Sequence, residues 1–317
     1  MGTMTLVTLD EIRAARERIR SIAKVTPLVD VSSLAGRPLW LKCESMQPGG
    51  AFKIRGAYNM VAQLTDDQRK RGVITYSSGN HGQAVALAAR ALGAPAVVVM
   101  PTTAPAIKVE GARGFSAEVM FAGTTSLHRR AKAEEEAAAR GLTMVPPFDH
   151  EWIIAGQGTL GLELLEQLPG LATVLVPIGG GGLVSGVAAA IKQSRPDVAV
   201  IGIEPSGAAS MKNAIDAGEV RTLENSKSIA DGLMAVRPGD LNFAHVRQFV
   251  DRIDTVEDAE IAAAVRWLFV SARIVAEPSG AATVAAALRE STPYAPPVVA
   301  IVSGGNIDPD DLAKYIS

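Results

Sequence analysis

Short apolar segments alternate with longer helical segments through most of this 317-residue chain. The apolar segments of the first half lie at 73–76, 96–100, 118–121 and 143–145. Further along, helical patterns at 153–167 and 184–193 alternate with apolar runs at 173–178, 198–204 and 298–302. Strands that alternate with helices form βαβ units and parallel sheets. The sequence therefore predicts an α/β protein of two domains, each with a mostly parallel sheet flanked by helices, with a cleft between them.

The length of the chain and its 48% of apolar residues allow more than one packed core. Pro146 and Pro147 interrupt the alternation of strands and helices. We expect a large domain from residues 1–65 and 147–317, and a smaller domain, residues 66–146, inserted between them. We expect no appended regulatory domain past residue 300. In the helical segment 126–140, basic residues precede a run of glutamates, a pattern typical of a solvated helix face.

The charge balance excludes several classes of partner. The chain has 31 basic and 33 acidic residues and no long run of one sign, so neither nucleic acid nor an anionic membrane is an expected partner. No uncharged run approaches bilayer length, and the N-terminus lacks a secretory signal. The single cysteine, Cys43, excludes an internal disulfide and multi-cysteine zinc sites. We therefore expect a cytoplasmic protein whose partner is a small molecule.

Four consecutive glycines follow the predicted strand 173–178. They are Gly179, Gly180, Gly181 and Gly182, and Leu183 begins the next predicted helix. Glycines leave the backbone free to turn its N–H groups toward an anion at the positive end of a helix. The pattern therefore predicts a phosphate site. A dinucleotide site is the alternative, but the strict G-x-G-x-x-G fingerprint fails because Val184 and Ser185 stand where glycine is required.

Lys53 lies between Phe52 and Ile54. A lysine in apolar surroundings loses hydration, so its pKa falls and the neutral amine needed for a Schiff base becomes more available. Most lysines are solvated surface residues, so this signal alone is weak. It gains weight from the motifs that accompany it.

These motifs are Phe52-Lys53, Ser77-Ser-Gly-Asn-His-Gly-Gln83, Gly179–Gly182, and Ser303-Gly-Gly-Asn306, with 154–159 and 277–281 in support. In this order, over nearly the whole chain, they resemble the pyridoxal-phosphate (PLP) dependent serine/threonine dehydratase and serine racemase family. That family has the fold of the tryptophan-synthase β-subunit, fold type II.

The resemblance implies roles for individual residues. Lys53 would carry PLP, and Phe52 would pack on the ring of the cofactor. Asn80 would meet the ring hydroxyl and Ser303 would meet the pyridine nitrogen. Glu277 would lie close to the ring. The phosphate would be held by Gly179, Gly180, Gly181, Gly182 and Leu183. The substrate carboxylate would be gripped by Ser77, Ser78, Gly79, Asn80 and His81, and Gly232 would close over the substrate. Lys53 and Ser78 would be the catalytic residues.

The expected reaction is the loss of water and ammonia from L-threonine or L-serine. A neutral hydroxyl such as that of Ser303 cannot hold the ring as pyridinium, which disfavours a long-lived carbanion and favours elimination. Racemisation is an alternative and needs a second acid opposite Lys53, the position of Ser78 in the family motif. Dehydration of hydroxyaspartate or a bulkier β-substituted serine, and a catalytically silent PLP-binding protein, are further alternatives. By resemblance the chain forms a homodimer or higher homo-oligomer.

Some positions depart from the family pattern. Gly49 and Ala51 stand where Thr and Ser are common beside the lysine, and Pro146 stands where histidine is common. A cation site found in part of the family falls on Glu204, Ala208 and Ser210. Because Ser210 replaces a carboxylate, a divalent ion is less expected there than a monovalent ion or none.

Two residues of the 77–83 motif also have simpler readings. His81, at the start of a predicted helix, is interpreted as a structural hydrogen-bonding residue and not as a general base. Asn80 is expected to cap that helix in addition to contacting the cofactor.

Overall fold

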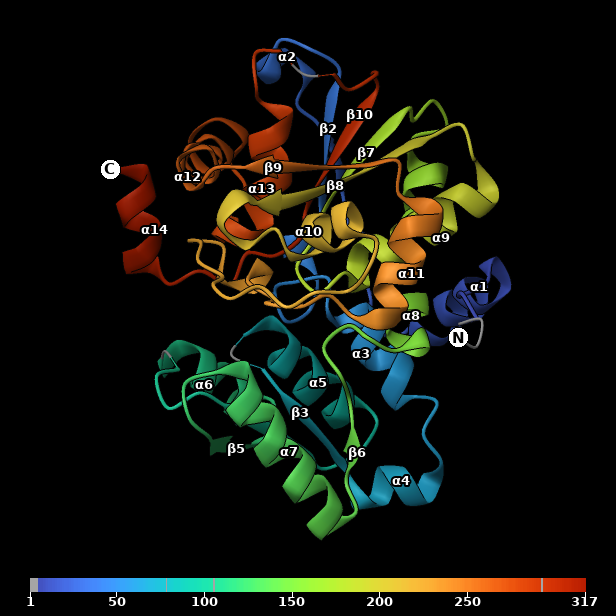
Figure 1. The fold of residues 1–317 in the computed structure, drawn as a ribbon, viewed down its shortest axis with the longest axis vertical. Helices are drawn as coiled ribbons and strands as arrows, with labels where there is room; N and C mark the ends of the chain where they lie inside the picture. The colour runs from blue at the N-terminus through green and yellow to red at the C-terminus, as the bar shows by residue number, and fades with distance from the viewer. Residues whose placement is uncertain (1–4, 78, 105, 292) are drawn as a thin grey trace.

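The computed structural model describes residues 5–77, 79–104, 106–291 and 293–317. Its strands form a six-stranded sheet of order β1-β2-β10-β7-β8-β9 and a four-stranded sheet of order β5-β4-β3-β6 (Figure 1). All pairs are parallel except β1 with β2. The strands are β1 Leu28–Asp30, β2 Leu39–Cys43, β3 Val73–Tyr76, β4 Ala96–Met100, β5 Glu118–Phe121, β6 Thr143–Met144, β7 Thr173–Pro177, β8 Ala199–Pro205, β9 Arg252–Val256 and β10 Val298–Val302. The predicted α/β class with two mostly parallel sheets is confirmed.

Helices cover both sheets (Figure 1). The α-helices are α1 Leu9–Ile19, α2 Ser32–Ala35, α3 Ile54–Val61, α4 Asp66–Arg71, α5 Asn80–Ala91, α6 Ala106–Gly114, α7 Ser126–Arg140, α8 Glu151–Gln167, α9 Gly182–Ser194, α10 Ser210–Ala217, α11 Asp240–Phe249, α12 Asp258–Trp267, α13 Pro278–Ala287 and α14 Pro309–Ile316. Single helical turns are η1 Glu44–Met46, η2 Ser206–Ala208, η3 Asp231–Leu233 and the π-helical η4 Leu268–Ala272.

The central strands are apolar on both faces because helices bury both faces. Every residue of β4, β7 and β10 is buried, as expected for parallel strands between helix layers. Edge strand β9 is different, because most of its residues are partly exposed and Arg252 is exposed. It therefore has no apolar run that would mark it in the sequence. The sequence pattern therefore finds the centre of each sheet more readily than its edge.

The two sheets belong to chain segments that separate in space. The four-stranded sheet and α4 to α7 lie at one end of the molecule in Figure 1, and the six-stranded sheet lies at the other end. Segments that follow β3, β7 and β10, from both sheets, line one cavity. This is the arrangement of open α/β sheets, which bind ligands beyond the carboxyl ends of their strands.

Candidate active site

The cavity between the two sheets has a volume of about 360 Å³. It brings together the described residues to which the sequence assigns cofactor and substrate roles: Phe52, Lys53, Ser77, Gly79, Asn80, His81, Gly179, Gly180, Gly181, Gly182, Leu183, Gly232, Glu277 and Ser303. Ser78, the predicted second catalytic residue, lies outside the described residues. Residues distant in the chain thus converge on one pocket of a size suited to a cofactor and a small substrate.

Lys53 immediately precedes α3 and lies half-buried in the wall of the cavity. Its Nζ donates to the backbone oxygen of Pro147 at 2.9 Å and lies 5.1 Å from the centroid of the Phe52 ring. Burial of the amine lowers the pKa of Lys53 to about 8. A substantial fraction of the side chain is therefore neutral near physiological pH, which a nucleophilic amine requires.

The turn that carries Lys53 explains one departure from the family pattern. Gly49 and Gly50 have φ angles of +80° and +74°, the left-handed region that L side chains rarely adopt. A threonine at position 49 would be strained in this conformation. The Asn306 Nδ2 donates to the Gly49 oxygen at 2.8 Å, and the Gly305 N–H donates to the Gly50 oxygen at 2.9 Å. The turn is thus fixed to the segment that follows β10.

The glycine turn lies between β7 and α9, and the helix begins at Gly182, one residue earlier than expected. Gly181 has a φ of +104°. Cβ atoms at Gly180 and Gly182 would press against Phe148, and one at Gly181 would press against Met211 and Asn242. The N–H groups of the first turn of a helix have no intrahelical partner, so this turn presents free donors at a positive helix end. The turn excludes side chains, and its free N–H groups could hold an anion.

Asn80 is the first residue of α5, and Gly79 is the N-cap, without a side-chain capping bond. The expectation that Asn80 caps the helix is therefore wrong. Its Nδ2 instead donates to Glu277 Oε1 at 2.5 Å, and its Oδ1 accepts from Asn306 Nδ2 at 2.8 Å. These two bonds leave the Asn80 side chain fixed between segments of the other sheet, on the cavity wall.

Glu277 is 4% exposed at the start of α13. Burial and then the charge of Asp231 raise the pKa of Glu277 to about 7, against a smaller opposing effect of the Asn80 amide. Ser303 follows β10; its Oγ donates to the Ser279 oxygen at 3.4 Å, and its own oxygen accepts from the Phe52 N–H. The cavity wall therefore offers a neutral hydroxyl and a carboxyl group that titrates near neutrality.

The His81 ring is buried and its Nε2 lies 3.1 Å from the Val145 oxygen. Burial, and then the charge of Lys53, lower the pKa of His81 to about 3. A histidine that stays neutral and contacts a backbone carbonyl fits the structural role expected from the sequence. Nearby, the Ser77 Oγ accepts from the Gly79 N–H, and the Gly232 N–H donates to Ser279 Oγ at 2.8 Å.

Charged residues that no sequence motif marks also line the cavity. Lys108 of α6 and Asp231 form an ion pair that joins the two sheets' segments across the cavity. Arg129 and Arg130 of α7 also line the cavity. The interpretation of this helix as a solvated face is right for Arg130, which is exposed and pairs with Glu134, and wrong for Arg129, which is half-buried. Arg129 lies four residues before the buried Ala133, on the same side of the helix. This spacing is the sequence signal that Arg129 faces the interior.

The predicted cation-site residues lie outside the cavity lining. Glu204 is buried at the end of β8, and its two oxygens accept from the N–H groups of Met211 at 2.9 Å and Lys212 at 2.8 Å. Burial raises the pKa of Glu204 to about 7. Ala208 is buried in η2, and the buried Ser210 Oγ lacks a hydrogen-bond partner among the described residues. Glu204 thus serves α10 as an N-terminal acceptor.

The described residues contain no group of three or more His, Cys, Asp and Glu side chains placed to hold a metal ion. Within 5–77, 79–104, 106–291 and 293–317, no helix has the length and apolar character needed to cross a membrane.

Comparisons with known proteins agree on one family. A family model described as pyridoxal-phosphate dependent enzyme matches residues 19–304. The chain is 40% identical over 315 residues to the L-threonine ammonia-lyase of Thermotoga maritima, covering 98% of this chain and 79% of that protein.

Solved structures give the same result. The structure of maize serine racemase superposes with a TM-score of 0.92 at 38% identity, covering 98% of this chain and 97% of that one. A pyridoxal 5'-phosphate-dependent aspartate racemase superposes with a TM-score of 0.90 at 34% identity, covering 98% and 99%. With this geometry, and with a family match over most of its length, the chain belongs to the family of pyridoxal-phosphate dependent enzymes.

Proposed function

We propose that this enzyme removes water and ammonia from a small β-hydroxy amino acid, L-threonine or L-serine, and yields a 2-oxo acid. The observation that carries the proposal is a half-buried lysine whose amine has a lowered pKa, in one cavity with a glycine turn and the neutral Ser303 hydroxyl. The L-threonine ammonia-lyase of T. maritima, similar over 98% of this chain, supports the same reaction class.

The residues of the cavity fit PLP. Cβ atoms at Gly180 and Gly182 would overlap Phe148, so the turn 179–182 requires glycine there, and its backbone amides are suited to a phosphate. Lys53 would carry the cofactor, and Phe52, Asn80 and Ser303 line the same cavity. We propose that Phe52 packs on the ring, Asn80 meets the ring hydroxyl, Ser303 meets the ring nitrogen, and Leu183 completes the phosphate site.

When bound, PLP supplies an electron sink for the bond that breaks at the α-carbon of the substrate. Lys53 is the base in this scheme: its amine, neutral in a substantial fraction because of its lowered pKa, accepts the α-proton. The Ser303 hydroxyl leaves the ring nitrogen uncharged, which favours loss of the β-hydroxyl as the α-proton departs. Elimination thus fits these residues better than transamination.

The start of α5 is proposed to bind the substrate carboxylate. Ser77, Gly79, Asn80 and His81 line the cavity at the N-terminus of this 12-residue helix, where N–H groups and the helix dipole favour an anion. Ser78 belongs to the same proposed subsite, and Gly232, which lines the cavity and donates its N–H to Ser279 Oγ, is proposed to close over the substrate. Racemisation stays the alternative reaction, with Ser78 as the acid opposite Lys53.

One assay tests the proposal. Purified enzyme loaded with PLP is incubated with L-serine, L-threonine, D-serine, hydroxyaspartate and β-substituted serines, and 2-oxo acid and inverted amino acid are both measured. We expect 2-oxo acid as the main product. Inverted amino acid without 2-oxo acid would identify a racemase, and neither product from any substrate would identify a silent PLP-binding protein.

A second candidate substrate, a β-hydroxy amino acid with a second carboxylate, is favoured by Arg129. Its guanidinium lines the cavity, burial lowers the pKa of Arg129, and its Nε is buried without a hydrogen-bond partner among the described residues. Across the described ranges it has no ion pair with a carboxylate, whereas Arg130 pairs with Glu134. The similar aspartate racemase acts, by its name, on a dicarboxylic amino acid.

Arg129→Met is therefore expected to lower kcat/KM for hydroxyaspartate relative to L-serine by about 10- to 100-fold, since a hydrogen bond to a charged group contributes about 1.5–3 kcal/mol. Arg140→Met, on the same helix but outside the cavity lining, is the matched control and should leave the ratio within about twofold of wild type. Equal losses for both substrates, or for both variants, would contradict a role of Arg129 in selecting dicarboxylates.

Chelation of divalent ions is expected to leave most of the activity in place. We propose that the Glu204, Ala208 and Ser210 site holds a monovalent cation or none, because Ser210 offers no carboxylate and the Glu204 oxygens already accept two amide bonds. Activity is measured after dialysis against a chelator, with and without added magnesium. Complete loss that magnesium restores would refute the assignment.

We further propose a cytoplasmic homodimer or higher homo-oligomer with a small amino acid as partner, and neither nucleic acid nor membrane. The buried free thiol of Cys43, whose pKa burial raises to about 11, is compatible with a reducing compartment. The domain limits at residues 65 and 147 stay a prediction. They place α4 to α7 and the four-stranded sheet in one unit.

A further inference from the structure

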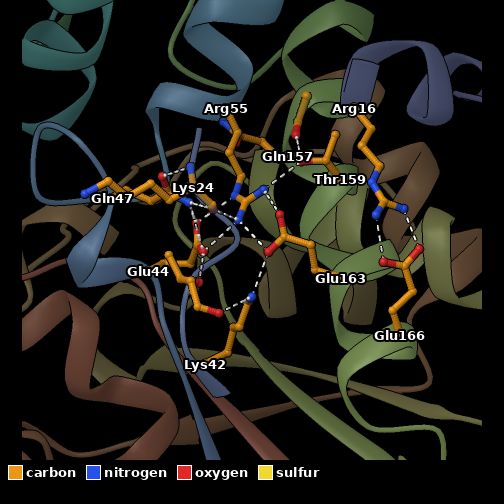
Figure 2. Close-up of polar contacts among 12 residues, drawn as sticks. Arg16, Lys24, Lys42, Glu44, Gln47, Arg55, Gln157, Thr159, Glu163 and Glu166 are labelled. Carbon is orange, nitrogen blue, oxygen red and sulfur yellow. Dashed lines mark hydrogen bonds and ion pairs between the residues drawn. The ribbon is translucent and has the colours of Figure 1, made fainter. Parts of the chain in front are cut away.

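A buried network of four ionisable residues lies beside the active site and outside its described lining. It consists of Lys42 of β2, Glu44 of η1, Arg55 of α3 and Glu163 of α8, and Figure 2 shows their side chains converging from these elements. The side chains are 0% exposed in Lys42 and Glu44, 1% in Arg55 and 6% in Glu163. Two cations balance two anions, so the network is neutral as a whole.

Arg55 is the centre of the network (Figure 2). Its Nε donates to Glu44 Oε2 at 2.7 Å and one terminal nitrogen donates to Glu44 Oε1 at 2.9 Å. The same guanidinium donates to both Glu163 oxygens, at 2.7 and 2.9 Å, to Thr159 Oγ1 and to the Lys24 oxygen. A planar fork of five N–H groups can make this pattern and a lysine ammonium cannot.

Lys42 occupies the other side of Glu163. Its ammonium donates to Glu163 Oε2 at 2.7 Å, to Gln167 Oε1 at 2.8 Å and to the Thr26 oxygen at 2.9 Å. These contacts join β2, α8 and the segment before β1, and none of them involves the lysine turn. Lys42 and Arg55 are therefore two cations of one network with different neighbours.

The network brackets the turn that carries the reactive lysine. Glu44 and Gln47 precede the turn, and the Gln47 amide bonds both Glu44 and the backbone of Lys24. Arg55 follows Lys53 by two residues and is held by Glu44 from one side and Glu163 from the other. Segment 47–55 is thus fixed at both ends, with Lys53 between them.

Close packing removes the remaining freedom of α3. The Gly56 N–H donates to Gln157 Oε1 at 3.2 Å, and a Cβ at Gly156 would approach the Arg55 oxygen to 2.6 Å. The backbones of α3 and α8 therefore touch, and a rotation of α3 would break this contact and the Arg55 fork together. The direction in which Lys53 leaves the start of α3 follows from that fixed orientation.

Stability is a weak reason for such a network. Desolvation of the four charged groups offsets most of the attraction in their three ion pairs, and apolar replacements of similar volume are often as stable. Burial by itself would raise the pKa of Glu44, but Arg55, with smaller contributions from Lys42 and Thr26, outweighs burial and lowers that pKa, so the pair stays charged. A fully satisfied charged network instead fixes one geometry, because few other arrangements satisfy every donor.

We propose that Arg55 is a positioning residue for Lys53: its fork to Glu44 and Glu163 holds the segment 47–55 so that the Lys53 amine points into the cavity toward Pro147. The proposal rests on the proposed role of Lys53 in binding PLP. It predicts that loss of the fork moves the amine without removing any group from the cavity.

The test compares Arg55→Lys with Lys42→Met. Both disturb the same buried network, but only the first touches the segment that carries Lys53. The readout is the pH dependence of amine labelling at Lys53 in the cofactor-free protein, followed by mass spectrometry, together with PLP affinity from absorbance titration. Thermal unfolding reports the structural loss in each variant.

We expect both variants to melt earlier than wild type. In Arg55→Lys the labelling midpoint of Lys53 should rise from about 8 toward the ordinary lysine value, because a displaced amine regains water, and PLP affinity should fall at least about tenfold. In Lys42→Met the labelling midpoint should stay at the wild-type value, and the PLP affinity should stay within about twofold of wild type. Unchanged labelling in Arg55→Lys, or an equal change in Lys42→Met, would overturn the proposal.

If Arg55→Lys does not fold, Glu44→Gln takes its place in the same labelling test. This substitution keeps the shape of the side chain and removes one charge from the fork, so we expect a smaller shift in the same direction, and an unchanged midpoint contradicts the proposal. Labelling in the cofactor-free protein is independent of the reaction catalysed. Failure of the proposed elimination would appear instead in the 2-oxo acid assay.

Discussion

Lys53→Ala is expected to remove all measurable 2-oxo acid release and the visible absorbance of bound PLP while the protein folds normally. The substitution removes both the amine that would carry the cofactor and the proposed base. A general base alone contributes about 10²- to 10⁴-fold, so the combined loss should exceed about 10⁴-fold. The assay of 2-oxo acid release and the absorbance spectrum after PLP addition measure the two effects.

The stability of the same variant gives an independent check. The pKa of Lys53 in the folded protein is about 8 and its ordinary value is 10.5, so between these values the unfolded chain binds more protons and this residue's contribution to stability rises with pH. Cofactor-free wild type should therefore gain stability relative to Lys53→Ala as pH rises from about 8 to 10.5. If borohydride traps the cofactor on another lysine of the wild-type enzyme, the assignment of Lys53 as the lysine that carries PLP is wrong.

Sequence motifs identified the cavity wall because the chemistry of that wall depends on residue type at fixed spacing. Glycines 179–182 follow a strand and open a helix, and a lysine between two apolar residues already implies a lowered pKa. These signals are local, so they survive without a structure. Every described residue to which they gave a cofactor or substrate role lines the cavity.

Groups whose role depends on distant partners could not be found in this way. Lys42 and Glu163 are 121 positions apart, and Arg55 and Glu163 are 108 apart, so nothing in the local sequence marks them as one network. Arg129 has the sequence surroundings of a surface residue, and its half-buried place depends on how α7 packs against the cavity. The capping role expected of Asn80 was wrong because Glu277 and Asn306 bind its side chain instead.

Gly180→Ala is expected to weaken PLP binding through a single methyl group. A Cβ at this position would overlap the ring of Phe148, so either the ring or the glycine turn must shift. Overpacking of this kind typically costs about 1–3 kcal/mol, and a cradle built from backbone amides loses its geometry when the turn moves. PLP affinity, measured by absorbance titration, should fall by about 5- to 150-fold.

Gly170→Ala is the matched control, because a Cβ there meets no atom within 4 Å. It should leave PLP affinity within about twofold of wild type. Phe148→Ala in the Gly180→Ala background removes the ring that the methyl group would strike. The double variant should therefore bind PLP more tightly than Gly180→Ala alone, a coupling expected only for residues in contact. If Gly180→Ala lowers the melting temperature but leaves PLP affinity unchanged, the phosphate is held elsewhere and residues 179–182 are only a tight connection between β7 and α9.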